Sequence, residues 1–317
     1  MKLAEVAKQP KGFRITGIYR ISRFDVKTAK NGKAYGDCMI SDTSGDVPAK
    51  YWDIPSATAA VMAKHGILRI EAALDFFKDS PQFTITGIGV PAESETTAML
   101  QNLGLMAKHD LAIMYAALVE FINAVAYEQF RLVLRHIFSG EFARQFQHHP
   151  GAVWNHHAWI GGLLEHTVEV AGSAVDYCKR NPSVNQDILL SAALLHDIGK
   201  VQEIEVDDIG LPLGFTRKGK LLRHIYLGME QVEHACVATG VSPEAALILK
   251  HCILAHHGQP EWGSPVEPMM VEAEILHYLD NLSAKTDQFG RDEERTTPGG
   301  FTRSATLRRD VYRPELK

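Results

Sequence analysis

The first 90 residues alternate between short apolar runs and polar turns. Apolar runs with the composition of β-strands occupy residues 14–21, 33–41, 47–52, 67–76 and 83–90. Turn signals separate them at Asn31-Gly32, at residues 42–46 (DTSGD) and at residues 78–81. Residues 55–65 begin with Pro55 and continue with small residues, which predicts a helix between the third and fourth strands.

Five strands with a helix after the third match the order of an OB-fold, a small five-stranded β-barrel. Another small β-barrel is the alternative that the pattern leaves open. The following residues 91–98 (PAESETTA) are small and polar, and they are predicted to form a linker.

From about residue 100 the apolar positions recur with the helical period. Gly199 and Gly240 stand where helix stop signals belong, and Ser242 followed by Pro243 is an N-cap signal. Helices are predicted at residues 111–125, 128–138, 141–147, 158–180, 185–197, 220–239, 243–256 and 268–284.

The chain is therefore predicted to be an α+β multidomain protein, a five-stranded OB-fold barrel followed by an all-α helical bundle. The expected domains are residues 1–92 for the barrel and 93–286 for the bundle. Residues 287–317 are charged and irregular, which predicts a C-terminal tail that packs on the body or is partly disordered. A chain of 317 residues with 45% apolar content suits two soluble globular domains.

The net charge of −5 excludes a global basic field, so a nucleic-acid partner needs a local patch. Residues 1–90 hold 13 basic against 9 acidic residues. Arg20, Arg23, Lys27 and Lys33 crowd the first hairpin, where OB-folds contact their ligands, although a solvated loop would look the same. Two or three of the barrel's aromatic residues are expected on a face that stacks with bases.

The four cysteines, Cys38, Cys178, Cys236 and Cys252, form no C-x-x-C pair, which argues against a disulfide framework and a zinc ribbon. No apolar stretch is long enough for a signal peptide or a membrane span. A cytoplasmic protein without a membrane partner is expected.

The candidate chemistry centres on residues 194–200 (LLHDIGK), where His196 and Asp197 end an apolar helix. An imidazole and a carboxylate form a ligand pair for a divalent metal. A buried ion pair explains the dipeptide equally well, because a polar pair in an apolar helix needs partners.

Five further residues, each near a helix end or on an apolar helix, favour the metal-ligand interpretation over the buried ion pair. A lone histidine in such a place is more often a satisfied core residue than a ligand. Seven in the order H…HD…H…HH…D point to a metal site. The seven are His166, His196, Asp197, His224, His256, His257 and Asp280.

This order resembles the HD phosphohydrolase superfamily in its two-metal form. The resemblance implies that His166, His196, Asp197 and Asp280 bind one divalent metal. It further implies that Asp197 bridges to a second metal, for which the ligands are His224, His256 and His257. Mixed histidine and carboxylate ligands favour Mn²⁺, with Fe, Co, Ni and Mg as alternatives.

The same resemblance gives further residues a role. Asp197 is implied to be catalytic, and so is Lys200, which would contact the scissile phosphate. A lysine favoured by the helix dipole is the alternative for Lys200. His156 and His157 are expected to line the substrate entrance or to support the ligands.

Nearly the whole chain from residue 13 resembles the YhaM-type 3′–5′ exoribonucleases of bacteria. The resemblance implies release of nucleoside 5′-monophosphates from single-stranded nucleic acid, with RNA preferred and single-stranded DNA also accepted. The matching segments are residues 40–46 (ISDTSGD), 49–53 (AKYWD), 156–167 (HHAWIGGLLEHT), 196–200 (HDIGK), 255–258 (AHHG), 263–268 (GSPVEP), 272–277 (EAEILH), 280–281 (DN), 300–302 (GFT) and 307–309 (LRR).

Two other functions stay open at this level. An HD phosphohydrolase could act on a small nucleotide, with the barrel as a regulator. A relaxase-like nucleic-acid-binding accessory protein could carry a similar GGLLEHT segment without catalysis. Association of the helical domain into a homo-oligomer also stays open.

Overall fold

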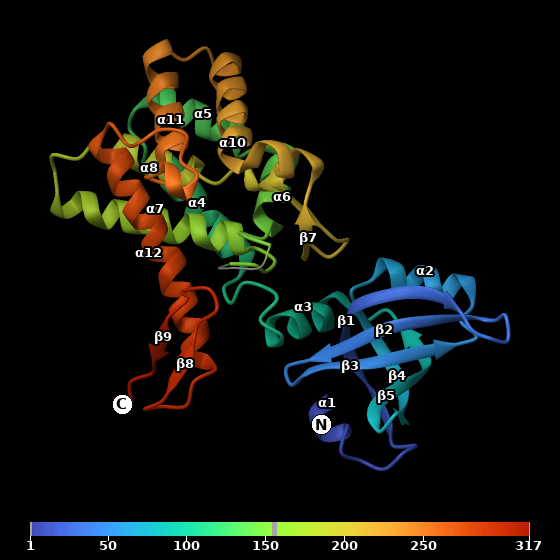
Figure 1. Ribbon diagram of the computed structural model, residues 1–317. Coiled ribbons are helices and arrows are strands. Elements are labelled where there is room, and N and C mark those ends of the chain that lie inside the picture. Colours follow the sequence, from blue (N-terminus) through green and yellow to red (C-terminus); the bar gives the residue numbers. More distant parts are fainter. Residues whose placement is uncertain (1, 154–156, 317) are drawn as a thin grey trace. The chain divides into compact units, whose positions relative to one another are not determined.

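The computed structural model describes residues 2–153 and 157–316 and divides into two compact units. The first comprises Met1–Met106 with Asp207–Ile209, and the second comprises Ala107–Val206 with Gly210–Lys317. Figure 1 shows that the first is built mainly from strands and the second mainly from helices. The prediction of an α+β chain with two structural parts agrees with this division.

The strands of the first unit close into a barrel in the order β1-β2-β3-β5-β4. β1 is antiparallel to both β2 and β4, whereas β3 and β5 are parallel. The elements of this unit are α1 (Leu3–Val6), β1 (Arg14–Thr28), β2 (Ala34–Asp42), β3 (Gly45–Trp52), α2 (Ser56–Lys64), β4 (Ile67–Phe77), β5 (Ser80–Gly89) and α3 (Glu93–Asn102).

Alternating side chains fill the barrel because successive strand residues point to opposite faces. Cys38 and Ile40 of β2 are fully buried, as are Leu68 and Ile70 of β4. β1 runs seven residues beyond its predicted end at Ile21. Its register shifts between Ile21 and Arg23, so its first half pairs with β4 and its second half with β2. Such a bulge lets one strand bend around a barrel.

The predicted linker at residues 91–98 is wrong, because α3 begins within it. The side chain of Glu95 accepts a hydrogen bond from the Ala92 N–H at 3.0 Å, which satisfies a donor at the start of the helix. Glu93 and Glu95 also place negative charge in the first turn, where the helix dipole favours it. Polar residues that look like a linker are here an N-terminal helix signal.

The second unit packs its helices around one large apolar core. Its helices are α4 (Leu111–Ala124), α5 (Glu128–Ile137), α6 (Gly140–His148), α7 (Gly162–Arg180), α8 (Gln186–Leu195), α9 (Lys200–Glu203), α10 (Arg217–Thr239), α11 (Pro243–Ala255), the 3₁₀ turn η1 (Pro260–Trp262) and α12 (Val271–Glu294). None of the described helices is long and apolar enough to span a membrane.

Two of the predicted boundary signals act as expected. The Ser242 side chain caps α11 by accepting from the Ala245 N–H, and Gly240 ends α10 in the left-handed region. Gly199 does not act in this way, because its φ of −64° and ψ of −18° are those of a right-handed helix. A Cβ at Gly199 would lie 2.0 Å from the His224 carbonyl oxygen, so close packing requires this glycine.

The all-helical prediction for the second domain is wrong in one place, where β6 (Ile204–Val206) pairs with β7 (Pro212–Phe215). In the C-terminal segment, which was predicted to be irregular, β8 (Phe301–Arg303) pairs with β9 (Asp310–Tyr312). The pairs are too short to show a strand period in the sequence. α12 runs to Glu294, eight residues beyond the predicted domain end at residue 286.

The C-terminal segment packs on α12, which was one of its two predicted states. The Arg313 guanidinium donates to the carbonyls of Glu293 and Thr296, at 3.1 and 2.8 Å. Arg309 lies over the ring of Phe289, 5.2 Å from its centroid. All four cysteines of the chain are buried free thiols.

Candidate metal centre

His196 and Asp197 lie at the buried end of α8. The Asn185 side chain caps the start of this helix, and its last seven residues are buried. His196 is 0% exposed and Asp197 is 3% exposed. A carboxylate so far from water needs compensating partners, so the surroundings of Asp197 define the site.

One group of donor atoms gathers around Oδ2 of Asp197. The Nε2 atoms of His166 on α7 and His196 are 3.1 Å apart. Oδ1 of Asp280 on α12 lies 3.1 Å from His166 Nε2 and 3.9 Å from His196 Nε2. Asp197 Oδ2 lies 3.5 Å from His166 Nε2 and 3.4 Å from His196 Nε2. His166, His196 and Asp197 thus place ligand atoms within 4.8 Å of one another, and Asp280 lies beside the two histidines.

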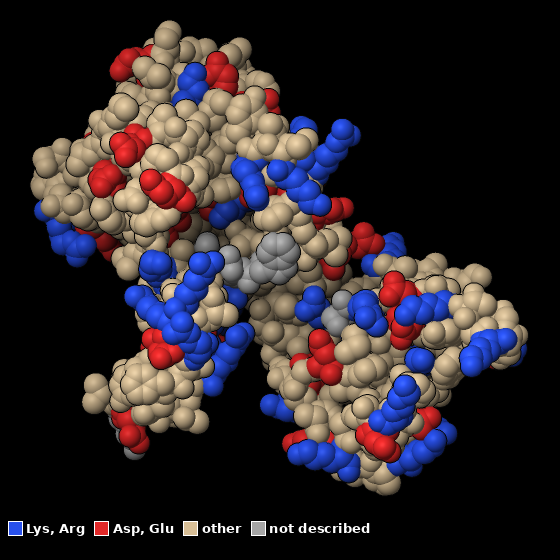
Figure 2. Space-filling model, viewed as in Figure 1, with Lys and Arg blue, Asp and Glu red and all other residues tan. Residues whose placement is uncertain are grey.

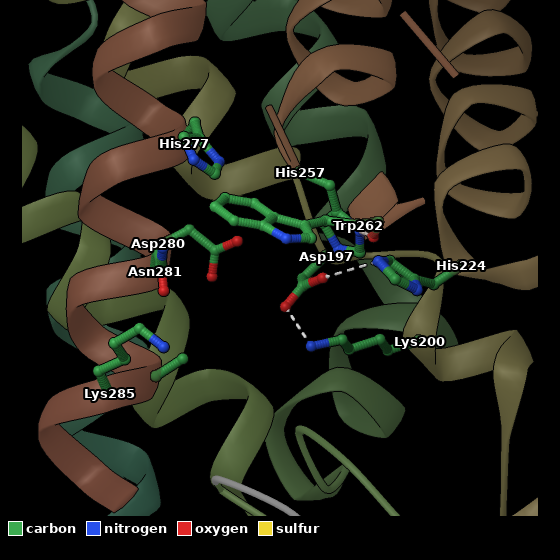
Figure 3. Close-up of a pocket in the computed structure, with 10 residues that line it drawn as sticks. Asp197, Lys200, His224, His257, Trp262, His277, Asp280, Asn281 and Lys285 are labelled. Atoms are coloured by element: carbon green, nitrogen blue, oxygen red, sulfur yellow. Dashed lines mark hydrogen bonds and ion pairs between the residues drawn. The ribbon is translucent and has the colours of Figure 1, made fainter. Parts of the chain in front are cut away.

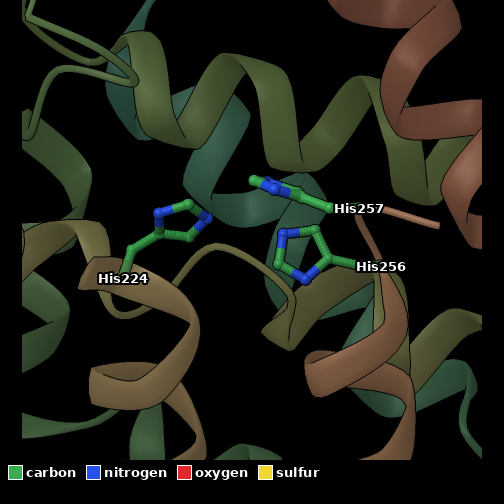
Figure 4. Close-up of side chains that lie close together, drawn as sticks. All are labelled: His224, His256 and His257. Carbon is green, nitrogen blue, oxygen red and sulfur yellow. The ribbon is translucent and has the colours of Figure 1, made fainter. Parts of the chain in front are cut away.

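A second group gathers beside the first. His224 of α10, His256 and His257 place their ligand nitrogens within 4.8 Å of one another. Figure 4 shows the three rings arranged around a common space, two from the end of α11 and one from α10. All seven predicted ligands are therefore brought together, although more than 110 residues separate the first from the last.

Asp197 joins the two groups through its two oxygens. Oδ2 faces His166 and His196, whereas Oδ1 lies 3.5 Å from His224 Nε2 and 3.9 Å from His256 Nε2. A carboxylate that divides its oxygens between two sets of imidazoles has the arrangement of a bridging ligand.

Hydrogen bonds to the opposite ring nitrogens fix the orientation of these histidines. Nδ1 of His196 donates to the Ala193 carbonyl at 2.8 Å, and Nδ1 of His256 donates to the Ile253 carbonyl at 2.6 Å. In both cases a helix end supplies the acceptor three residues earlier. Nε2 then carries the lone pair and faces the centre, as in most histidine metal ligands.

His166 is oriented through a side-chain relay. The Ser283 hydroxyl donates to Glu169 at 2.9 Å, so its oxygen accepts from Nδ1–H of His166 at 3.0 Å. In the neutral imidazole, Nε2 of His166 then carries the lone pair and faces His196. Two lone pairs facing each other at the 3.1 Å between His166 and His196 repel unless a cation lies between them.

Glu203 orients His224 with both of its oxygens. Oε1 accepts from the His224 backbone N–H at 3.2 Å, and Oε2 lies 3.3 Å from Nδ1. His257 donates through Nδ1 to the Trp262 carbonyl at 2.9 Å. The sequence prediction missed Glu203, since nothing in its spacing shows that α9 turns back toward α10.

The hydrogen bonding of these residues also indicates that they suit a divalent metal. Within the described residues, the buried Nε2 atoms of His224 and His256 have no hydrogen-bond partner. A buried polar atom without a partner is costly and calls for an explanation. A metal ion supplies one, because imidazole nitrogens and carboxylate oxygens are its common ligands.

The electrostatics keep the ligands in the forms that bind metal. Burial alone would raise the pKa of Asp197, but Lys200 and His196 outweigh it and hold the pKa well below its usual range. Burial, with the neighbouring His257 and His196, holds the pKa of His256 well below its usual range. Asp197 is thus a carboxylate and His256 a neutral imidazole, the forms required for ligation.

A cavity of about 510 Å³ opens onto these groups. Figure 3 shows the Trp262 indole lying across it, with the amino groups of Lys200 and Lys285 reaching in from opposite walls. The lining residues are Asp197, Lys200, His224, His257, Trp262, His277, Asp280, Asn281, Ala284 and Lys285. A cavity of this size holds a small organic ligand.

Several of these lining residues were not predicted as site residues. Trp262 is 53% exposed and stacks on the buried ring of His277, with centroids 5.4 Å apart. His277 donates through Nδ1 to the His256 carbonyl at 3.0 Å, so it supports a ligand instead of being a plain core residue. Lys285 stands four residues after Asn281, a spacing that places both residues on the same face of α12.

The remaining predicted residues lie elsewhere. His157 is 3% exposed, its ring is 5.2 Å from that of His166, and it does not line this cavity. Of its two expected roles, support of a ligand fits this position better than substrate contact. His156 lies outside the described residues.

The four basic residues of the first hairpin belong to the barrel unit. Arg23 and Lys27 pair with Asp37, at 3.7 Å for Arg23, and Lys33 pairs with Asp53 at 2.5 Å. These acidic partners reduce the positive field that the hairpin was expected to offer. Arg20 is half-buried near the start of the β1–β2 pairing.

Comparison with known proteins agrees with this geometry. Residues 163–285 match the HD domain family, and this span contains all seven candidate ligands. The protein is therefore a metal-dependent phosphohydrolase of the HD superfamily.

Relatives that match along most of the chain identify its family within the HD superfamily. The chain is 33% identical over 290 residues to 3′-5′ exoribonuclease YhaM of Geobacillus sp. (strain WCH70), covering 90% of this chain and 87% of the relative. It is 33% identical to the Bacillus pumilus (strain SAFR-032) enzyme and 32% identical to that of Bacillus subtilis (strain 168), covering 90% of each chain in both cases. The chain belongs to the YhaM family of 3′-5′ exoribonucleases.

Proposed function

We propose that this protein is a 3′–5′ exonuclease that shortens single-stranded RNA, and also single-stranded DNA, by releasing nucleoside 5′-monophosphates. The observation that carries this proposal is Asp197, whose two oxygens face two separate groups of histidines. The name shared by the relatives supports the direction of cleavage and the RNA substrate.

The proposed cofactors are two divalent metal ions, with Mn²⁺ favoured by the mixed ligands. One would be held by His166, His196 and Asp280, and the other by the three histidines shown in Figure 4, with Asp197 shared. When bound, such a pair activates a water molecule for in-line attack on a phosphodiester and neutralises the charge that develops.

Lys200 is positioned to bind a phosphate of the substrate. Its Nζ lies 2.5 Å from Asp197 Oδ2, and its side chain lines the cavity. Burial lowers the pKa of Lys200, but Asp197 outweighs this and raises it, so the amine stays charged. A fixed cation beside the scissile phosphate stabilises negative charge in the transition state. The exposed Trp262 indole offers a stacking face for a base at the same place.

We further propose that the barrel is an OB-fold that binds the single strand. Its strand order and the helix α2 between β3 and β4 are those of this fold. Ligands of OB-folds lie across strands 2 and 3 and the loop between strands 4 and 5.

An exposed aromatic cluster occupies that surface. Tyr35 of β2 and Trp52 of β3 are paired in register, with ring centroids 4.9 Å apart. Lys50 Nζ lies over three rings, 5.1 Å from Tyr35, 5.1 Å from Trp52 and 5.8 Å from Phe77. Trp52 is 46% exposed, and Phe77, beside the β4–β5 turn, is 59% exposed. Exposed rings with a lysine among them suit bases and a phosphate backbone.

A second positive surface lies on the helical unit. Residues 301–313 hold four arginines and one acidic residue. Figure 2 shows Lys and Arg side chains gathered over this end of the unit. Such a surface would attract the backbone of a nucleic acid in a protein whose net charge is negative.

Replacement of both Trp52 and Phe77 by alanine is expected to weaken RNA binding at least tenfold. Loss of one base–aromatic stack costs about 1–3 kcal/mol, and each 1.4 kcal/mol is about a factor of ten in Kd. Fluorescence anisotropy with a labelled single-stranded RNA in the presence of a chelator measures this.

The matched control is the pair Trp52→Phe and Phe77→Tyr, which keeps a ring at each position. These variants are expected to bind nearly as the wild type does. Equal binding by the alanine and aromatic variants would show that the strand does not stack on this cluster.

The proposed function is tested by measuring metal content and then incubating the same sample with 5′-labelled single-stranded RNA and Mn²⁺. About two metals per chain and a ladder that shortens from the 3′ end are expected, and chelation should abolish the ladder. If the sample hydrolyses a small phosphate ester but leaves the RNA intact, the substrate is a small phosphate ester instead of RNA. If the protein binds the strand and forms no product, it is a nucleic-acid-binding accessory protein and not an exonuclease.

A further inference from the structure

Arg223 has a backbone conformation that favours glycine. Its φ is 64° and its ψ is 160°, inside α10, where the residues on both sides are helical. This region of backbone space is essentially restricted to glycine, because a Cβ is crowded there. Strained residues of this kind cluster at functional sites, where the surrounding structure holds them.

The packing around Arg223 explains why the backbone must turn. A Cβ at Gly219 would lie 2.2 Å from the Glu203 carbonyl oxygen, so the chain before Arg223 is pressed against α9. On the other side, Gly199 is as closely packed against the His224 carbonyl. The backbone is therefore held on both sides of residue 223. A glycine would meet this turn without strain, so the backbone gives no reason for an arginine.

The side chain offers a reason. Arg223 is exposed, and its guanidinium lies 5.0 Å from the centroid of the Phe215 ring. Within the described part of the chain, no carboxylate lies within 4.0 Å of it. Stacking on a ring holds a guanidinium in place and leaves its N–H groups free to bind an anion.

Arg223 also lines a second cavity beside the metal centre. This cavity has a volume of about 330 Å³, and Glu203, the acidic residue among its described lining, is bonded to His224. Four lining residues are shared with the first cavity, so the two meet at the metal centre. They are Lys200, His224, His257 and Trp262.

We propose that Arg223 binds a phosphate of the substrate strand that flanks the scissile phosphate, so that the second cavity is a phosphate subsite. This rests on the proposed strand cleavage at the metal centre. A strand whose scissile phosphate lies where the cavities meet extends from it on each side. The guanidinium fork matches two oxygens of a phosphodiester, and its charge is not neutralised by a neighbouring carboxylate.

The test compares two substrates in steady-state kinetics with Mn²⁺. One is a single-stranded RNA oligonucleotide, and the other is bis(p-nitrophenyl) phosphate, a diester without a flanking phosphate. For Arg223→Gln, the ratio of kcat/KM on RNA to kcat/KM on the small diester is expected to fall about tenfold, as for loss of one charged hydrogen bond. The slope of log Kd for RNA against log salt should also decrease by about 0.7.

Two further variants separate binding from folding. Arg223→Gly is expected to show the same fall in the ratio, with a melting temperature at least as high as that of Arg223→Gln, because glycine relieves the strain. Arg217→Gln removes an exposed arginine of the same helix that does not line the cavity, and its ratio should match the wild type.

The outcomes distinguish failure of the subsite from failure of the proposed function. An unchanged ratio in Arg223→Gln, with RNA still shortened, would overturn the subsite alone. An equal loss on both substrates would also overturn it, since Arg223 would then act by positioning His224. A wild type that cleaves the small diester and leaves RNA intact would refute the proposed function and the subsite with it.

Discussion

Replacing Asp197 with asparagine is expected to lower the rate of RNA shortening by at least about 10³-fold. Metal-assisted stabilisation contributes several kcal/mol to such reactions, and each 1.4 kcal/mol changes the rate about tenfold. Asparagine keeps the shape of the side chain but presents an NH₂ group to one of the two histidine groups that Asp197 faces. A hydrogen-bond donor cannot ligate a metal, so the bound metal should fall by at least one ion per chain. Single-turnover kinetics and elemental analysis measure the two effects.

Asp176→Asn is the matched control for this variant. Asp176 lies on α7, pairs with Lys179 at the surface and is far more exposed than Asp197. It should retain both metal and activity. Full activity in Asp197→Asn would exclude the assignment of Asp197 as the shared ligand. A melting temperature close to that of the wild type would show that the loss is not caused by unfolding.

Gly199→Ala is expected to destabilise the helical unit and to remove activity together. The new Cβ would lie 2.0 Å from the His224 carbonyl oxygen and 2.5 Å from the Gly228 nitrogen, both of which are backbone atoms that cannot rotate away. Overpacking of this kind costs about 1–3 kcal/mol and occasionally more. The melting temperature of a unit of this size should therefore fall by about 2–12 °C. Because relief of the clash moves His224, metal binding should weaken as well.

Gly290→Ala provides the comparison for this prediction. Gly290 lies in α12, and nothing within 4 Å would meet its Cβ. Alanine in place of glycine in a helix is neutral or slightly stabilising. If Gly199→Ala melts at the same temperature as Gly290→Ala, then α9 and α10 are not as closely packed as the structure indicates. Differential scanning calorimetry of both variants decides this.

The local sequence was sufficient for the elements with strong periodic or capping signals. Ser242, Pro243 and Gly240 act on neighbouring backbone groups, so the turn between α10 and α11 follows from adjacent residues. The strand pairs β6–β7 and β8–β9 could not be predicted, because three or four residues carry no period and depend on the helices they pack against. For the same reason, the sequence shows Gly199 only as a stop signal and not as a contact point with His224.

The candidate ligands were recognisable because metal chemistry restricts residue types. His196, Asp197 and the pair His256-His257 are distinctive at the ends of apolar helices, and their order along the chain resembles a known family. The residues that orient them are less distinctive. Glu203, Ser283 and many other polar residues have the same local context, and only the packing of α9 and α12 selects these two.

The sequence by itself thus determined the kind of chemistry, the strand-rich first part and the helical second part. These depend on residue type and on periods of a few residues. The tertiary structure decided which oxygen of Asp197 faces which histidines, and which aromatic residues of the barrel are exposed. It also decided that residue 223 must take a glycine-like conformation while carrying an arginine. Such properties arise where segments distant in sequence meet, so no local pattern contains them.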